Sequence, residues 1–261
     1  MIGKKINMLN PLPIAKAHDR FLRNFLETAQ RHVIDNVRQV PSIDANGYIR
    51  PVHICVKLYP QISDNILVVG CLQNLIKLDG FEPERLTGVP LTSLSPMSHH
   101  YLLTDEYHGV ACVSEGLALE IGLHAKFFSA SDIFHVPIHV DRLFKKSITT
   151  VDMQRQLETS LGGELEMDTS GILEHINLEQ LTNEEISSIR KRLGTYQVHV
   201  QLKTLVFDPK HCTVKLYRVI ILPKEAYLSS GLPESPGFSS KMVSTQIAGG
   251  NTTWLNDTNG N

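Results

Sequence analysis

Two long stretches near the end of the chain alternate between apolar and polar residues, and they constrain the fold more than any other feature. They are "YQVHVQLKTLVF", residues 196–207, and "CTVKLYRVIIL", residues 212–222. The turn sequence "DPKH" separates them. Because successive side chains of a strand point to opposite faces, the alternation predicts two strands that each turn one face to a core. We therefore expect residues 196–207 to pair antiparallel with residues 212–222.

A second hairpin is predicted in the first third of the chain. The segment "IDANGYIRPVHICVKLYP" contains Asn46-Gly47, a strong turn signal, and Val52, Ile54 and Val56 then alternate as in a half-buried strand. The next apolar segment, "DNILVVGCLQNL", reads as another strand. We expect residues 47–59 to pair antiparallel with residues 64–76, and an earlier apolar run predicts a strand over residues 33–40.

Two segments have the spacing of helices. Residues 13–29 begin with a proline in the first turn, and apolar residues recur there at intervals of three and four, which predicts a helix. Its expected buried stripe consists of Ile14, His18, Phe21, Leu22 and Phe25. The segment "LTNEEISSIRKRL" predicts a short helix that begins with a capping box of Thr182 and Glu185.

Length, charge and cysteine content narrow the class of protein. The 261 residues suit one large domain or two small ones, and 42% of them are hydrophobic, enough for a packed core. A net charge of -2 gives no electrostatic reason to expect nucleic acid or an anionic membrane as a partner. The four cysteines are far apart and form no C-x-x-C motif, which is typical of reduced thiols in the cytoplasm.

The beginning of the chain resembles PAS sensor domains. "IGKKINMLNPLPIAKAHDRFLRNFLETAQRHVI" contains the His-Asp pair of the PAS pattern, and an Asn-Gly hairpin and a final apolar strand follow in the expected order. The resemblance covers residues 2–76. It is closest to FixL-like PAS domains, which bind haem, and to the cytoplasmic PAS segments of large membrane proteins of the tiny-macrocysts type. Further on, "YLLTDEYHGVACVSEGLALEIGL" is similar to the opening strands of a PAS domain.

We therefore expect an α+β fold, with PAS-like antiparallel sheets and short helices packed on one face, in two units. Residues 1–78 would form the C-terminal half of a PAS-like domain, without its two opening strands. Residues 79–98 contain three prolines and predict a linker, and residues 99–224 would form a second PAS-like domain. Residues 225–261 are rich in Ser, Gly, Asn and Thr and are expected to be disordered.

The resemblance to FixL-like domains also implies a pocket. His18 falls at the haem-ligating position and Arg38 at the position that contacts bound gas. Val33, Ile54 and Val56 fall on the apolar distal wall, and Phe21 also belongs to the predicted pocket. The alternative, which we favour, is a histidine packed in a core without haem. Burying an unpaired imidazole costs about 1–3 kcal/mol, so we expect His18 to lie beside Phe21 and Leu22 with a hydrogen-bond partner.

The expected function is that of a PAS-type sensory module that binds a small ligand or a partner within a larger signalling protein. Its expected partners are other PAS or signalling domains or a second copy of itself, without nucleic acid or membrane contact by this segment. The expected location is the cytoplasm, including the cytoplasmic part of a membrane protein. A structural protein–protein module with a filled core is the first alternative, and a haem-based gas sensor through His18 is the second. We find no constellation that predicts an enzyme or a metal site.

Overall fold

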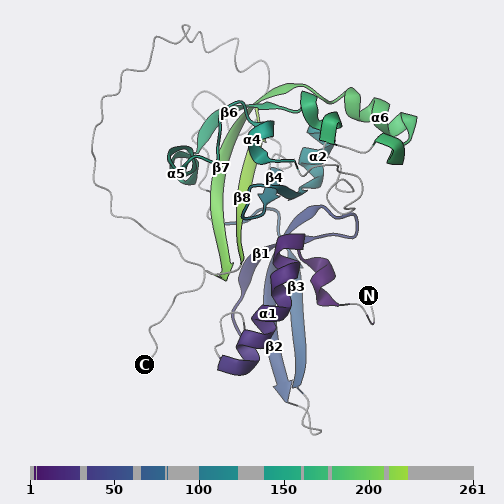
Figure 1. Ribbon diagram of the computed structural model, residues 1–261. Helices are drawn as coiled ribbons and strands as arrows, with labels where there is room; N and C mark the ends of the chain where they lie inside the picture. The colour runs from purple at the N-terminus through teal and green to yellow at the C-terminus, as the bar shows by residue number, and fades with distance from the viewer. Residues whose placement is uncertain are drawn as a thin grey trace, which may run out of the picture.

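The computed structural model describes residues 3, 5–29, 34–60, 66–79, 81, 100–122, 138–159, 162–175, 178–208 and 212–222. Most of the predicted linker and the whole predicted tail lie outside these residues, so both remain predictions. Two antiparallel sheets and several helices make up the described fold, which confirms the expected α+β class (Figure 1). Among the described helices, none is both long and apolar enough to cross a membrane.

The first sheet has three strands in the order β1-β2-β3. A short 3-10 helix and the helix α1 precede it. The bounds are η1 Ile6–Leu9, α1 Leu12–Thr28, β1 Arg38–Ile43, β2 Ile49–Pro60 and β3 Ile66–Asn74. The turn at Gly47 connects β1 to β2, with Gly47 in the left-handed region at φ 85°. Val56 of β2 lies opposite Gly70 of β3, so the predicted pairing of residues 47–59 with 64–76 is confirmed.

The second sheet has five strands in the order β5-β4-β8-β7-β6. In this order β4, which comes first along the chain, lies next to β8, which comes last. The bounds are β4 His100–Thr104, β5 Val110–Val113, β6 Gly163–Asp168, β7 Thr195–Asp208 and β8 Cys212–Ile221. Leu202 lies opposite Tyr217, so the predicted antiparallel hairpin of residues 196–207 and 212–222 is confirmed.

The helices that accompany the five-stranded sheet lie between β5 and β7 in the chain. They are α2 Glu115–Ile121, α4 Val140–Leu143, α5 Val151–Glu158, η4 Ser170–His175, η5 Leu178–Gln180 and α6 Asn183–Arg190. The predicted capping box begins α6, where the Thr182 hydroxyl accepts a hydrogen bond from the Glu185 amide and the Glu185 carboxylate accepts one from the Thr182 amide.

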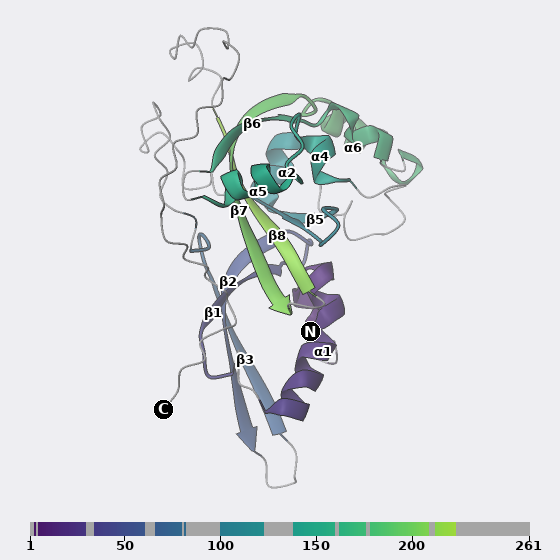
Figure 2. The same ribbon diagram turned by 60° about the vertical axis from the view of Figure 1, so that its left-hand side comes forward.

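Each face of the five-stranded sheet is covered by a different core. On the inner face, residues such as Leu102, Val200 and Tyr217 pack against Leu117 of α2 and Leu157 of α5. On the outer face, the sheet contributes Tyr101, Leu103, Leu205, Val214 and Leu216 to a second core. Ile14 and Ala17 of α1, Ile49 of β2, and Leu78 and Phe81 complete that core. The first segment of the chain thus covers the outer face of the sheet formed by the second (Figure 2).

Two local predictions need correction. The strand predicted over residues 33–40 is β1, which begins at Arg38, because Asp35 adopts a left-handed conformation with φ 63° and interrupts the extended run. Leu22 was predicted on the buried stripe of α1, but 44% of its surface is exposed. The fully buried residues of α1 are Ile14 and Ala17, so the stripe is rotated away from Leu22.

Candidate functional site

The candidate site is the junction at which α1 and the beginning of β2 meet the five-stranded sheet. Phe21 of α1 stacks on Phe207 of β7, with ring centroids 6.3 Å apart and planes 21° from parallel. The thiol of Cys212, at the start of β8, lies 3.8 Å from the carbonyl oxygen of Pro13. Helix α1 therefore contacts both long strands of the second sheet near the hairpin that joins them (Figure 2).

Backbone and charge contacts join the two sheets on another side of the junction. Ile49 of β2 forms a parallel bridge with Ser114, which precedes α2. The guanidinium of Arg50 is 3.0 Å from the Asp44 carboxylate and 2.5 Å from the Glu115 carboxylate. Arg50 thus links the β1–β2 turn to the first turn of α2. Its side chain is about half exposed, so we assign this link a role in alignment more than in stability.

The segment that follows β3 is also attached to the second sheet. The Leu78 amide donates a hydrogen bond to the buried Tyr101 hydroxyl at 3.0 Å, and burial raises the pKa of Tyr101. The Lys203 ammonium donates to the Asp79 carbonyl at 2.9 Å and lies 6.0 Å from the centre of the Phe81 ring. Burial lowers the pKa of Lys203, while Asp79 opposes this shift.

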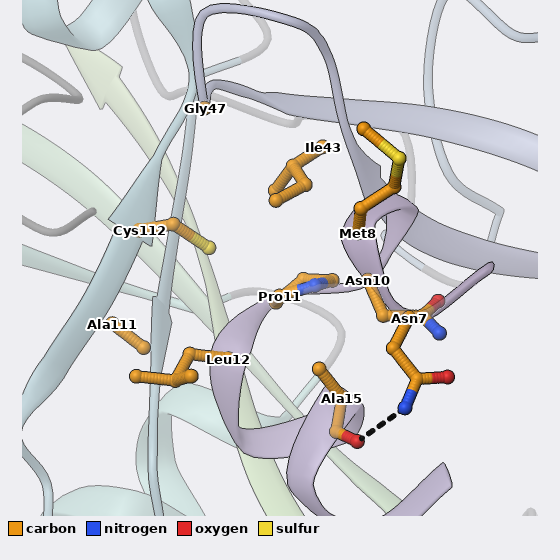
Figure 3. A pocket seen from close by; sticks show the side chains of 10 residues that line it. All are labelled: Asn7, Met8, Asn10, Pro11, Leu12, Ala15, Ile43, Gly47, Ala111 and Cys112. Atoms are coloured by element: carbon orange, nitrogen blue, oxygen red, sulfur yellow. Dashed lines mark hydrogen bonds between the residues drawn. The ribbon is translucent and has the colours of Figure 1, made fainter. Parts of the chain in front are cut away.

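A small cavity of about 240 Å³ opens at the junction (Figure 3). Its lining comes from η1, the start of α1, the β1–β2 turn and β5. The lining residues are Asn7, Met8, Asn10, Pro11, Leu12, Ala15, Ile43, Gly47, Ala111 and Cys112. The Asn7 amide donates to the Ala15 carbonyl and to the Asp19 carboxylate, so this polar group on the lining is already engaged.

His18 lies on the flank of the buried stripe of α1 and is half-buried. Its ring meets the Phe21 ring edge-on, with centroids 6.5 Å apart. Within the described residues its Nδ1 has no hydrogen-bond partner, so the predicted partner is not found for this atom. Burial lowers the pKa of His18, and Asp19 partly opposes the shift.

The other residues of the predicted pocket belong mostly to the first sheet. Arg38 of β1 lies opposite Ile54 of β2, and Val56 forms a bridge with Ile34. Val33 lies outside the described residues. Phe21, in contrast, packs against the second sheet. The cavity of Figure 3 is lined by none of these residues, and nothing in the described geometry supports a step through haem, so the haem pocket remains a prediction.

A polar cluster on the inner face of the five-stranded sheet escaped the sequence analysis. We call Thr104, His108, Lys215 and Tyr217 the inner polar cluster. Thr104 and Tyr217 are fully buried, and Lys215 lies opposite Thr104 on the neighbouring strand. Among the described residues, neither the two hydroxyls nor Nδ1 of His108 has a hydrogen-bond partner of full geometry. The only signal in the sequence is a polar residue at an inward position of each apolar strand.

Burial is the largest cause of the pKa shift of each titratable group in this cluster. Burial raises the pKa of Tyr217, while the Thr104 hydroxyl lowers it and Asp141 and Glu158 raise it further. Burial lowers the pKa of Lys215, and Glu158 opposes that shift. Burial also lowers the pKa of His108, with Lys215 and His139 adding to the effect. The site therefore favours a neutral phenol and a neutral imidazole beside a lysine that is easier to deprotonate than usual.

No protein-family model matches the chain. A protein of Dictyostelium discoideum, named as a probable serine/threonine-protein kinase, is 26% identical over 131 residues. The aligned segment covers 41% of this chain and 9% of the Dictyostelium protein. The chain therefore corresponds to less than a tenth of that protein, and this similarity does not establish a family.

Proposed function

We propose that the chain is a PAS-type sensory module of a larger signalling protein. In this proposal a small ligand or a partner binds at the helix-covered inner face of the five-stranded sheet. The resulting displacement of the sheet is transmitted to α1, which packs on the outer face. The order of elements supports the proposal: in residues 100–222, two strands and short helices precede β6, and the hairpin β7–β8 follows after η4, η5 and α6. Two opening strands, short helices and a final hairpin are also what the resemblance to PAS domains implies.

One observation carries the proposal: a single sheet separates two cores, and the outer core joins this sheet to α1, β2 and the segment that follows β3. Along β8, Tyr217 belongs to the inner core and its neighbour Leu216 to the outer core. Leu216 shares the outer core with Ile14 of α1. Close-packed interiors transmit a displacement instead of absorbing it, so a change at Tyr217 is felt at α1.

The inner polar cluster indicates the chemistry of the ligand. Buried hydroxyls are normally hydrogen-bonded, and a ligand with polar atoms would satisfy Thr104 and Tyr217. A ligand that accepts hydrogen bonds from them would also interact favourably with the nearby Lys215 ammonium. The proposed ligand is thus a small polar molecule with acceptor oxygens. Kinase activity, which the name of the Dictyostelium protein mentions, is not part of the proposal.

The test uses a methyl group of α1 as a reporter. Leu117 of α2 is fully buried in the inner core, on the opposite side of the sheet from Ile14. In the Leu117→Ala variant a cavity replaces the side chain, and we expect the NMR resonance of the Ile14 δ1 methyl to shift. Leu117→Val serves as a milder variant, because removing a buried leucine costs about 2–5 kcal/mol.

The matched control is Leu119→Ala on the same helix, where 55% of the leucine is exposed. In this control we expect the resonance of the Ile14 δ1 methyl to stay unshifted. If the inner-core variants leave the Ile14 resonance unmoved while inner-face methyl groups shift, the two faces are not coupled. That result would favour a structural interaction module with a filled core.

A further inference from the structure

Two of the four cysteines face each other across the first sheet. Cys55 of β2 lies directly opposite Cys71 of β3, in an antiparallel ladder of nine residue pairs without a register shift. Both strands belong to the long hairpin that extends away from the five-stranded sheet (Figure 1). Residues directly opposite each other on antiparallel strands point to the same face of the sheet. The two thiols are therefore neighbours, although they are well separated in the chain.

The ladder also fixes the distance between the two cysteines. In an antiparallel ladder, hydrogen-bonded and non-hydrogen-bonded residue pairs alternate. The Leu75 amide donates to the Pro51 carbonyl at 2.9 Å, and this pair continues the ladder by one position. Counting from it in steps of two makes Cys55 and Cys71 a hydrogen-bonded pair. Their Cα atoms are then about 5.5 Å apart, inside the range of about 4.4–6.8 Å that disulfides span.

The same geometry makes a disulfide at this position easy to reduce. The Cβ atoms of directly opposite residues are about 4.5–5.5 Å apart, at the wider end of this range in a hydrogen-bonded pair. A relaxed disulfide holds its Cβ atoms about 3.5–4.5 Å apart. The bond would therefore draw the two strands together and store strain, and strained disulfides are the more easily reduced ones. Such a bond suits a reversible modification more than a permanent cross-link.

The four cysteines differ in their access to a reagent in solution. All four thiols are free, but Cys71 is exposed and Cys55 is half-buried. Cys112 and Cys212 are buried in the outer core. Burial raises the pKa of the Cys112 thiol, which suppresses the thiolate form that reacts. A thiol reagent in water therefore meets Cys71 first, and the cysteine beside it is Cys55.

We propose that Cys55 and Cys71 form a reversible disulfide when the chain meets a low-molecular-weight disulfide of the glutathione type. The Cys71 thiolate attacks one sulfur of the reagent, the S–S bond of the reagent breaks, and one thiolate leaves. The Cys55 thiolate then attacks the Cys71 sulfur of this mixed disulfide, and the second thiolate leaves. The reagent gains two electrons, and the two protons of the cysteine thiols pass to the two thiols released. An excess of the released thiol reverses both steps.

The two faces of the sheet supply a matched control. In the variant Cys71→Ser/Leu72→Cys the thiol moves one position along β3 and so to the opposite face, because successive side chains of a strand alternate. Leu72 exposes 46% of its surface, so the new thiol remains accessible to the reagent. This register-shifted variant keeps the number of cysteines, but its exposed thiol cannot reach Cys55 in the folded sheet. Cys55→Ser is the second variant, in which Cys71 has no thiol opposite it.

In the experiment the full chain is incubated with mixtures of oxidised and reduced glutathione. The remaining thiols are then alkylated, and disulfide-linked peptides are identified by mass spectrometry. We expect Cys55–Cys71 as the main linkage of the wild type, with the same yield at low and high protein concentration because the bond is intramolecular. The register-shifted variant should form at least about tenfold less intramolecular disulfide. Cys55→Ser should keep glutathione attached to Cys71, because no second thiol displaces it.

Two results would overturn the proposal. In the first, the wild type keeps glutathione on Cys71 or keeps both thiols free in every mixture, which means that Cys55 does not reach Cys71. In the second, the wild type and the register-shifted variant form equal amounts of intramolecular disulfide, since a bond that depends on the sheet would distinguish them. Circular dichroism before and after oxidation verifies that each protein is folded during the reaction.

Discussion

At the scale of single residues, the sequence predicted only approximately which side chains are buried. The sequence indicated that His18 lies near a core, but it did not show that Leu22 would be exposed or that Ala17 would be buried. Helical periodicity defines a stripe only to within a residue or two, and the partner surface decides its centre. Thr104 and Tyr217 show the same limit, because their inward orientation depends on a sheet whose strand order the sequence did not provide.

Because burial lowers the pKa of His18, its imidazole stays neutral to a lower pH in the folded chain than in the unfolded chain, where the ordinary value is 6.5. As pH falls through about 6.5, the unfolded state binds more protons and the free energy of unfolding decreases. We predict that His18→Gln reduces this loss of stability, measured by urea unfolding between about pH 7.5 and about pH 5.5.

His108→Gln is the companion variant, because burial also lowers the pKa of His108. The double variant should lose less stability on acidification than either single variant. If His18→Gln shows the full decline of the wild type, then His18 is not held neutral by its surroundings in the folded chain.

At the scale of elements, strong local patterns predicted structure well and weak ones did not. The alternation on both sides of a turn predicted the β2–β3 and β7–β8 pairs. The helices α4 and α5 have four and eight residues, and α5 lacks the capping box that marked the start of the equally short α6. The polar strand β6 is extended because it pairs with β7, a tertiary cause that local sequence does not show.

The capping box of α6 provides a test at this scale. Thr182→Ala removes the hydroxyl that accepts a hydrogen bond from the Glu185 amide. We expect the free energy of unfolding to fall by about 0.5–2 kcal/mol. The control is Thr150→Ala at the start of α5, where the threonine side chain makes no capping bond, so the loss should be smaller. Equal losses for both variants in thermal or urea unfolding would argue against a stabilising capping box.

At the scale of the whole molecule, the two predicted units share the outer core. The division at residues 79–98 was based on prolines, and most of that segment lies outside the described residues. Leu78 and Phe81 are buried against the second sheet, and α1 covers its outer face. Sequence patterns predict elements and their pairing, but packing between distant segments depends on complementary surfaces with no local signal. The shared outer core is therefore what the structure adds.

A double-mutant cycle on Phe21 and Phe207 tests most directly whether α1 docks on the outer face of the five-stranded sheet. The two rings stack across the junction with centroids 6.3 Å apart. We predict that Phe21→Leu and Phe207→Leu are coupled by about 0.5–1.5 kcal/mol in the free energy of unfolding. Leu22→Ala combined with Phe207→Leu is the control and should be additive, because Leu22 is exposed. Additivity of the Phe21 and Phe207 variants within about 0.3 kcal/mol would contradict the docking of α1 on this sheet.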